Sequence, residues 1–266
     1  VRSRGLGDVY KRQVLFTKEG KGAGYARNIG LSHARGKWII FADADDFFTA
    51  NCFTILNEYM DSPHKVIYFN VRFVMSDDPS QESRRGTYYT NFFNDVNPEN
   101  KLRYQSQVPW GKMIRRSFLS TFHIQFDETR IANDVYFSCL VGIYAPKVTT
   151  DRRIIYYCTE SDQSLAMSKQ DRESLIIRFN ASMKCNRLLR QEKIHYYLSP
   201  LPWCIPSAKT KEWLPAKYFF EYLFFFRLQA FKELYYAFSA ILSHMNEPAT
   251  KETDNQCNKK TTNLRE

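Results

Sequence analysis

The chain has 266 residues, of which 44% are hydrophobic and 25% are charged. These values are usual for a soluble globular protein with one sizeable core and room for a smaller helical appendage. The formal net charge of +10 favours anionic partners such as a nucleotide diphosphate, a nucleic acid or an acidic membrane, although a basic surface that only aids solubility fits as well. The cysteines are scattered without CxxC spacing, which argues against a zinc knuckle or a disulfide framework and favours a reducing compartment.

The first 13 residues have no apolar periodicity and hold four basic residues against one acid. They also lack the apolar core of a signal peptide. The string is similar to translated read-through of a sequencing adapter, so we expect residues 1–13 to be a non-native leader. The native sequence is then expected to begin within a domain, near Val14.

An alternation of helices and strands follows. A glycine-rich turn over 18–24 leads into a helix expected over 25–35. The apolar run 37–42 has the length of a strand, and its continuous hydrophobicity predicts a central parallel strand covered on both faces. A further strand is expected over 65–74. This pattern indicates an α/β fold.

The rest of the chain is less regular. Residues 76–100 are polar and turn-rich, which predicts a loop or a small excursion of the chain, and from about residue 171 the apolar spacing becomes helical. Mixed or helical segments are expected over 110–120 and 133–144, and short strands over 124–126, 148–150 and 154–158. Together the patterns predict three regions after the leader: an α/β domain over 14–165, a helical region over 166–245 and a disordered polar tail over 246–266.

Three aspartates, Asp43, Asp45 and Asp46, come directly after the apolar run. Asp43 and Asp45 can point the same way where the strand leaves the sheet, because side chains alternate along a strand. Ligands of open α/β sheets bind beyond the carboxyl ends of the strands. Crowded carboxylates repel one another unless a cation lies among them, and oxygen ligands suit Mg²⁺ or Mn²⁺. A turn in which an aspartate caps the next helix fits the same residues, so both interpretations stay open.

The surrounding residues extend this pattern. Residues 22–31 read GAGYARNIGL, residues 34–36 read ARG, and residues 38–46 read WIIFADADD. This arrangement resembles the signature of family 2 glycosyltransferases, in which a Gly-x-x-x-Ala-Arg-Asn-x-Gly helix leads through an Ala-x-Gly corner into an apolar strand ending in Asp-x-Asp-Asp. The resemblance covers about residues 18–158. It implies the GT-A fold, a Rossmann-like and mostly parallel sheet with flanking helices, here followed by the C-terminal helical region.

The resemblance also implies roles for single residues. Asp45 would bind Mg²⁺ or Mn²⁺, assisted by Asp43 or Asp46, and the metal would meet the diphosphate of a nucleotide-sugar. The residues that would lie at this donor are Arg27, Asn28, Asp43 and Lys112. Without the resemblance, Arg27 fits a surface position on an amphipathic helix, and Lys112 fits a solvated lysine.

An inverting glycosyltransferase needs a base that takes the proton of the acceptor hydroxyl. The family often carries a Glu-Asp pair at the head of a helix after a Phe-Asp-Glu-like strand, and this chain has FDE at 126–128 followed by Asn133 and Asp134. Asp134 is therefore the candidate catalytic base. Asn133 replaces the usual Glu, which puts that neighbour's contribution to acceptor binding in doubt. Helix capping by Asn133, with Asp134 in the first turn, is the alternative and is compatible with catalysis.

Members of the family normally open with a strand, a helix and a strand that carry an Asp-Asp-Gly-Ser-x-Asp motif for the nucleotide. This chain has no such motif. We therefore expect the chain as written to be an N-terminally truncated fragment that is inactive or poorly folded, and the longer gene product to be active. The resemblance implies a saccharide or lipid-linked saccharide acceptor and a role in bacterial cell-surface polysaccharide assembly, with acceptor recognition around 76–100 and in the C-terminal region.

Residues 219–242 are dense in aromatic side chains, but charged residues interrupt the run and argue against a membrane-spanning helix. An amphipathic helix on the membrane surface is expected, and the excess of Lys and Arg over Glu across 178–245 favours an anionic leaflet. A helix packed on the catalytic domain or on a second subunit is the alternative. The expected location is cytoplasmic or peripheral on the inner face of the membrane. No nucleic-acid partner is expected, because the basic residues match no known motif.

Two other functions compete with glycosyl transfer. Haloacid-dehalogenase-like phosphatases also carry Asp-x-Asp after an apolar strand, but Thr or Val normally follows two residues after the second Asp, where this chain has Phe47. A later Gly-Asp-x-x-x-Asp is also missing. A non-catalytic binding module that keeps the GT-A fold is the second alternative, and the substitution at Asn133 suggests it.

Overall fold

The computed structural model describes residues 14–16, 22–83, 86–160, 171–204, 214–227 and 229–235. The predicted leader over 1–13 and the predicted tail over 246–266 lie outside these ranges. The chain forms two compact units, residues 1–214 and residues 215–266. Each unit is described by itself.

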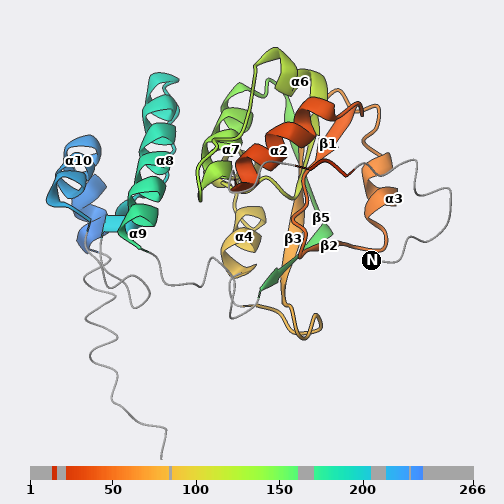
Figure 1. Ribbon diagram of the computed structural model, residues 1–266, viewed down its shortest axis with the longest axis horizontal. Coiled ribbons are helices and arrows are strands. Elements are labelled where there is room, and N and C mark those ends of the chain that lie inside the picture. The colour runs from red at the N-terminus through yellow and green to blue at the C-terminus, as the bar shows by residue number, and fades with distance from the viewer. Residues whose placement is uncertain are drawn as a thin grey trace, which may run out of the picture. The chain divides into compact units, whose positions relative to one another are not determined.

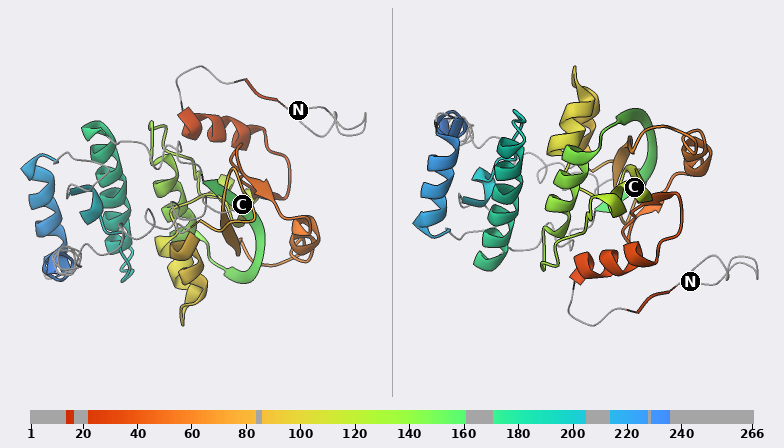
Figure 2. Two further views of the ribbon diagram at one scale, coloured as in Figure 1. Left: turned by 90° about the horizontal axis from the view of Figure 1, so that it is seen from below. Right: turned by 90° about the horizontal axis from the view of Figure 1, so that it is seen from above.

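The first unit contains five strands and eight helices among its described residues. The strands are β1 (Trp38–Ile40), β2 (Phe47–Phe48), β3 (Val66–Met75), β4 (Lys112–Arg115) and β5 (Val148–Glu160). The helices are α2 (Gly22–His33), α3 (Cys52–Asn57), α4 (Gly86–Phe93), α5 (Pro98–Gln105), α6 (Arg116–Thr121), α7 (Asn133–Tyr144), α8 (Arg172–Gln191) and α9 (Leu201–Cys204). Figures 1 and 2 show α7 and α3 on opposite sides of the sheet.

The sheet has the strand order β1-β4-β3-β5-β2. β4 pairs antiparallel with β1 and β3, β5 pairs parallel with β3, and β2 pairs antiparallel with β5. β1, β3 and β5 therefore run in one direction, and β4 and β2 run in the other. The predicted α/β class is confirmed, and the pairing among the described strands is mixed rather than mostly parallel.

The core lies on both faces of β3, whose residues Val66 to Phe69 are fully buried. This is the continuous apolar strand that a doubly covered sheet requires. The run 37–42, predicted to be the central strand, instead forms β1 at the edge of the described sheet. Its middle residue, Ile39, packs into the core, while Trp38 and Ile40 are partly buried. A short edge strand can thus carry the same continuous run of apolar residues as a central strand.

Three local predictions are corrected. The predicted loop over 76–100 contains α4 and the start of α5, because Tyr89, Phe92 and Phe93 lie on one face of α4 and are buried. Residues 124–126 are not a strand. The two short strands expected over 148–158 are one strand, β5, with an irregularity in its pairing to β3 near Asn70. The segment over 133–144 is a helix, α7, with the predicted bounds.

The second unit contains α10 (Ala216–Phe226), followed by a helical segment over 229–235. Arg227 ends α10 with φ of 49°, a left-handed backbone conformation that a helix does not continue through. The single amphipathic helix predicted over 219–242 is therefore interrupted at Arg227, and residues 236–242 lie outside the described residues. Among the helices that the structure describes, none combines the length and the apolar character that a membrane crossing requires.

Candidate functional site

Helix α2 is held against the segment that precedes α7. The Asn28 side-chain amide makes two hydrogen bonds to the backbone of Phe126. Its Nδ2 donates to the Phe126 carbonyl oxygen at 3.0 Å, and its Oδ1 accepts from the Phe126 NH at 2.8 Å. A Cβ at Gly24 would lie 2.1 Å from the carbonyl oxygen of Asp127, so glycine alone permits this approach. The Asn28 amide thus positions α2, and its contact with the donor stays a prediction.

Arg27 joins the two acidic motifs that the sequence singled out. Its Nη2 donates to Asp43 Oδ1 at 2.5 Å, and its Nη1 donates to Asn133 Oδ1 at 2.8 Å. The guanidinium carbon also lies 5.5 Å from the centre of the Phe126 ring. Two segments about ninety residues apart in the chain are therefore brought to one place by a single side chain that is itself mostly buried.

Asp46 is bound to strand β5. Its Oδ2 accepts a hydrogen bond from the Tyr156 hydroxyl at 2.7 Å, and its Oδ1 accepts one from the backbone NH of Thr159 at 2.7 Å. Burial raises the pKa of Asp46, and these hydrogen bonds oppose that rise. Tyr156 was not singled out by the sequence, yet its hydroxyl also accepts a hydrogen bond from the NH of Asp43 at 2.8 Å. Asp46 therefore fixes the acidic turn to the sheet.

Asp45 differs from both neighbouring acids. Asp43 is paired with Arg27 and Asp46 with β5, whereas the Asp45 carboxylate is exposed and has no partner within the described residues. Its carbonyl oxygen accepts a hydrogen bond from the Thr159 hydroxyl at 2.8 Å. The backbone of Asp45 is thus held in place while its carboxylate stays open to a ligand.

Asp134 stands in the first turn of α7, beside the Arg27 bridge. Burial raises the pKa of this carboxyl group; its own backbone NH and the charges of Arg27 and Lys112 lower it, and the charge of Asp43 raises it. Asp134 directly follows Asn133, which bonds to the same guanidinium as Asp43, and its role as the base stays a prediction. The residue before α7, Ala132, has φ of 53° and ψ of 26°, a strained conformation for alanine.

The helix begins differently from the predicted cap. Asn133 is the first residue of α7 and no N-cap, because that position belongs to Ala132 and carries no side-chain hydrogen bond. Asn133 is buried, and its side-chain oxygen accepts from Arg27. The Asn that replaces the family's usual Glu is therefore a neutral partner for Arg27 and leaves Asp43 as the charged one.

Lys112 is fully buried. Its Nζ donates to the carbonyl oxygens of Ser106 at 3.1 Å and Val108 at 2.6 Å. It also lies 5.6 Å from the centre of the Tyr68 ring. Burial lowers its pKa to about 7. Its ammonium group faces these backbone carbonyls, has no solvent-exposed surface and holds the segment that precedes β4. That Lys112 lies at the donor stays a prediction.

An aromatic layer underlies the acidic turn. Trp110 stacks on Tyr156 with ring centres 6.1 Å apart, and Phe73 meets Trp110 edge-on at 5.6 Å. Gly111 follows Trp110 with φ of 67°, a conformation that favours glycine. The turn at Gly111 thus lets Trp110 stack on Tyr156 while Lys112 is buried.

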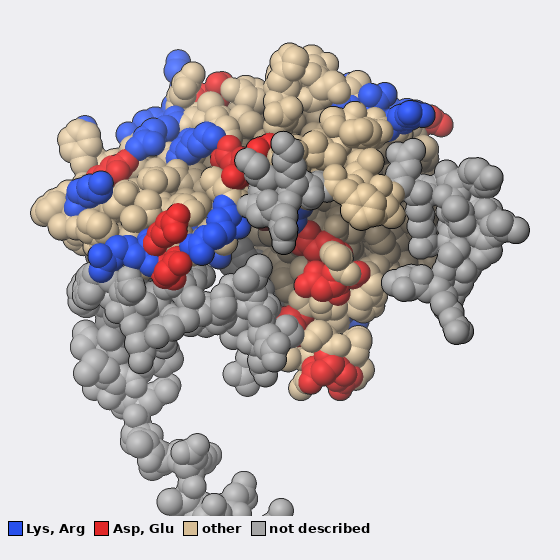
Figure 3. Space-filling view, in the orientation of Figure 1, with Lys and Arg blue, Asp and Glu red and all other residues tan. Residues whose placement is uncertain are grey.

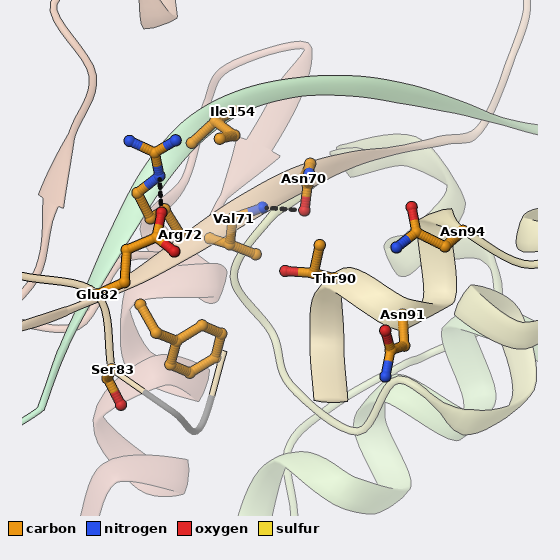
Figure 4. A pocket seen from close by; sticks show the side chains of 10 residues that line it. Asn70, Val71, Arg72, Glu82, Ser83, Thr90, Asn91, Asn94 and Ile154 are labelled. Carbon is orange, nitrogen blue, oxygen red and sulfur yellow. Dashed lines mark hydrogen bonds and ion pairs between the residues drawn. The ribbon is translucent and has the colours of Figure 1, made fainter. Parts of the chain in front are cut away.

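A cavity of about 320 Å³ lies between β3 and α4. Figure 4 shows Asn70, Thr90 and Asn94 around it, with the Arg72–Glu82 ion pair on the other side. Amide, hydroxyl and charged groups therefore surround this cavity together with Phe73. Phe73 also connects it to the aromatic layer under the acidic turn. Much of the lining comes from the region 76–100 that the sequence associated with acceptor recognition.

The carboxylates of the acidic turn are the groups that could bind a divalent cation. In the part of the chain that the structure describes, no three His, Cys, Asp or Glu side chains are grouped to hold a metal ion. Asp43 and Asp46 are hydrogen-bonded within the protein, and the predicted metal site at Asp45, assisted by Asp43 or Asp46, stays a prediction. Mg²⁺ is commonly held by one or two carboxylates, with substrate phosphates and water as the other ligands. The open carboxylate of Asp45 fits that arrangement.

The mixed sheet with its flanking helices has the fold of GT-A glycosyltransferases. The chain is similar to the crystal structure of S. aureus TarS 1–349 in complex with UDP-GlcNAc, with a TM-score of 0.52 and 18% identity over 74% of this chain and 56% of that chain. TarS 1–349 without ligand gives a TM-score of 0.47 at 19% identity, covering 71% and 50% of the two chains. The chain thus spans little more than half of the TarS 1–349 structure. No curated protein matches the sequence.

The family model described as "Glycosyl transferase family 2" matches residues 8–122. The match includes α2, β1 and the acidic turn, so the resemblance drawn from those motifs is confirmed over these residues. Asp134 lies beyond the matched residues. The match begins at residue 8, within the predicted leader, whose non-native origin stays a prediction.

Proposed function

We propose that the protein is an inverting glycosyltransferase that moves a sugar from a nucleotide-diphosphate donor to a hydroxyl acceptor. The observation that carries this proposal is the Arg27 bridge, because it brings the acidic turn and the head of α7 together. A donor held at Asp45 and a base at Asp134 would then flank one reaction centre. The UDP-GlcNAc bound in the similar TarS structure supports a nucleotide-sugar as the donor class.

Asp45 is the proposed metal ligand. It is the one aspartate of the acidic turn whose carboxylate has no partner within the described residues. Mg²⁺ or Mn²⁺, when bound there, would neutralise charge on the departing diphosphate. The proposed role of Asp43 is to hold Arg27, and that of Asp46 is to fix the turn on β5. Metal affinity therefore depends on one exposed carboxylate positioned by two bonded ones.

Asp134 is the proposed base. The acceptor oxygen attacks the anomeric carbon of the donor sugar, and the bond from that carbon to the phosphate oxygen breaks. Asp134 takes the proton of the acceptor hydroxyl, and the nucleoside diphosphate leaves with the bonding electron pair. Attack opposite to the leaving group inverts the anomeric centre. A base positioned in this way contributes ~10²–10⁴-fold to the rate, and its raised pKa brings it closer to the pH at which it must accept a proton.

The cavity between β3 and α4 is the proposed acceptor subsite. Asn70, Thr90, Asn91 and Asn94 offer hydrogen-bond donors and acceptors suited to sugar hydroxyl groups. The nearby Phe73 belongs to the same aromatic layer as Trp110, so the cavity adjoins the site without sharing its charged groups. A saccharide or lipid-linked saccharide fits this lining.

A role in bacterial cell-surface polysaccharide assembly, at the cytoplasmic face of the membrane, is the wider proposal. The second unit supports membrane association: Phe220 and Phe224, one helical turn apart in α10, are 66% and 79% exposed. Exposed aromatic side chains of this kind suit the membrane interface. Flotation with anionic liposomes, with and without residues 212–245, tests this: equal flotation of both proteins would reject it.

The test of the proposed function is a panel of nucleotide-sugars with Mn²⁺ and simple saccharide acceptors, with the product anomer read by NMR. Because the chain spans little more than half of TarS 1–349, the assay is run on the chain extended by its upstream coding sequence and on the 266 residues alone. We expect an inverted product that disappears with Asp134→Asn. A retained anomeric configuration would reject the inverting mechanism, and binding of a donor without turnover would favour the non-catalytic module.

A further inference from the structure

A second cavity lies at the other end of β1. The register of β1 and β4 pairs Trp38 with Arg115, and the backbone NH of Arg116 donates to the carbonyl oxygen of Lys37 at 3.1 Å. Two basic segments that are far apart in the sequence are therefore joined at one edge of the sheet. Since β1 runs from this edge toward Asp43, the cavity and the acidic turn lie at opposite ends of the strand.

The cavity has a volume of about 320 Å³. Ligand pockets have volumes of about 300–1,000 Å³, so it is large enough for a small group. It is lined by Arg35, Lys37, Arg115, Arg116 and Ser117. One carboxylate, Asp61, pairs with Lys37 at 2.8 Å, and its side chain is 98% exposed. Four cationic residues thus line this cavity, and Asp61 is not among its lining residues. Figure 3 shows Lys and Arg side chains gathered at the upper right, over the region of β1 in Figure 1.

Arg115 is fixed in position at this cavity. Its Nη2 donates to the carbonyl oxygen of Ser62, and its guanidinium carbon lies 4.3 Å from the centre of the Trp38 ring. Its Nε is buried without a hydrogen-bond partner among the described residues. A buried donor without a partner is energetically unfavourable, and no described residue relieves that here.

The other cations retain free donors. Arg35 is exposed and has no partner within the described part of the chain. Arg116 uses its Nε for the carbonyl oxygen of Gly36 at 2.8 Å, which holds its guanidinium at the cavity edge. Guanidinium groups bind phosphate oxygens in a fork of parallel hydrogen bonds, and Ser117 adds a hydroxyl donor.

We propose that this cavity binds the phosphate group of an anionic ligand, at a site separate from the reaction centre. The group is a phosphate monoester or diester, carried by a soluble compound or by a lipid. The proposal is independent of the proposed glycosyl transfer, because none of its residues belongs to the acidic turn or to α7.

The experiment is a titration of the 266-residue chain, labelled with ¹⁵N, at constant ionic strength. The probes are inorganic phosphate, glycerol 3-phosphate, and vesicles of phosphatidylcholine with or without phosphatidylglycerol; the readout is the backbone amide signals of Gly36 and Ser117. The test variant is Arg35→Gln with Lys37→Gln, which removes two exposed charges. The matched control is Arg152→Gln with Lys193→Gln, which removes two exposed charges elsewhere.

We expect saturable shifts of these signals with at least one phosphate-bearing probe, and about tenfold weaker binding in the test variant, because it removes two of the positive charges that face the phosphate. Saturation with the soluble probes would identify a soluble ligand, and a response only to phosphatidylglycerol would identify a lipid headgroup. The control should bind as the unmodified chain does. Equal weakening in both variants, or no saturable shift with any probe, would overturn the proposal.

Discussion

The hydroxyl of Tyr156 donates a hydrogen bond to Asp46 Oδ2 at 2.7 Å. The Tyr156 hydroxyl oxygen also accepts a hydrogen bond from the backbone NH of Asp43 at 2.8 Å. One side chain of β5 therefore fixes both ends of the acidic turn and sets where the Asp45 carboxylate lies. The geometry of the site thus depends on a residue more than a hundred positions away in the sequence.

Replacing Tyr156 with Phe removes both hydrogen bonds. We expect a loss of ~1–3 kcal/mol in the free energy of unfolding, because the polar groups of the turn lose a buried partner. We also expect more Mn²⁺ to be needed for half-maximal turnover, because Asp45 is less well positioned. Tyr157→Phe is the control, since that ring stacks on Phe47 and its hydroxyl makes no hydrogen bond within the described residues. Equal effects of the two variants would contradict the role of Tyr156.

Two glycines of α2 should respond in opposite directions to alanine. A Cβ at Gly24 would lie 2.1 Å from the backbone oxygen of Asp127, whereas one at Gly30 would meet nothing within 4 Å. Gly24→Ala should therefore destabilise the fold by ~1–3 kcal/mol through steric overlap. Gly30→Ala should stabilise it by ~0.5–1 kcal/mol, because alanine is the better helix former. Urea unfolding measures both, and effects of the same sign would show that α2 does not pack as described.

The pH dependence of turnover should report the ionisation of Asp134. A base acts in its deprotonated form, so kcat/KM should rise with pH and level off above the pKa of Asp134, which burial raises above that of an ordinary aspartate. The charge of Arg27 lowers this pKa. Arg27→Gln should therefore move the acidic limb to higher pH, apart from any loss of rate. An acidic limb at the same pH in both proteins would contradict the assignment.

Lys112 should make stability increase with pH. Its pKa is about 7 in the folded chain and about 10.4 in an unfolded one, so between these values the unfolded state binds more protons. The free energy of unfolding should then rise by about 2 kcal/mol between pH 7 and pH 9. Lys112→Met removes the titrating group and should flatten this rise, whatever its effect on stability at one pH. An unchanged slope would show that Lys112 stays protonated in the folded chain.

The sequence predicted the elements of the candidate site because their residues lie in short, contiguous motifs. The string from Gly22 to Asp46 predicted the helix, the strand and the acidic turn in their correct order. It could not show which way each side chain faces. Asn28 and Lys112 were predicted to lie at the donor, and both donate hydrogen bonds to backbone carbonyl groups inside the protein. No pattern in the neighbouring sequence indicates either contact.

Two further features escaped prediction for different reasons. Tyr156 contacts Asp46 across 110 residues, and no local pattern encodes such a pairing. Helix α4 did leave a signal: Tyr89, Phe92 and Phe93 have the spacing of one helical face, but the polar residues around them favoured a loop. The mixed sheet was missed because an apolar edge strand and an apolar central strand have the same composition.

The most direct test of the account compares donor binding with turnover in Asp45→Ala and Asp134→Asn, using the chain extended by its upstream coding sequence. Calorimetry with the accepted nucleotide-sugar should show that Asp134→Asn still binds the donor with Mn²⁺ but loses ~10²–10⁴-fold in kcat. Asp45→Ala should lose the Mn²⁺ dependence of donor binding. Full turnover in Asp134→Asn, or unchanged Mn²⁺-dependent binding in Asp45→Ala, would contradict a single site built from these two carboxylates.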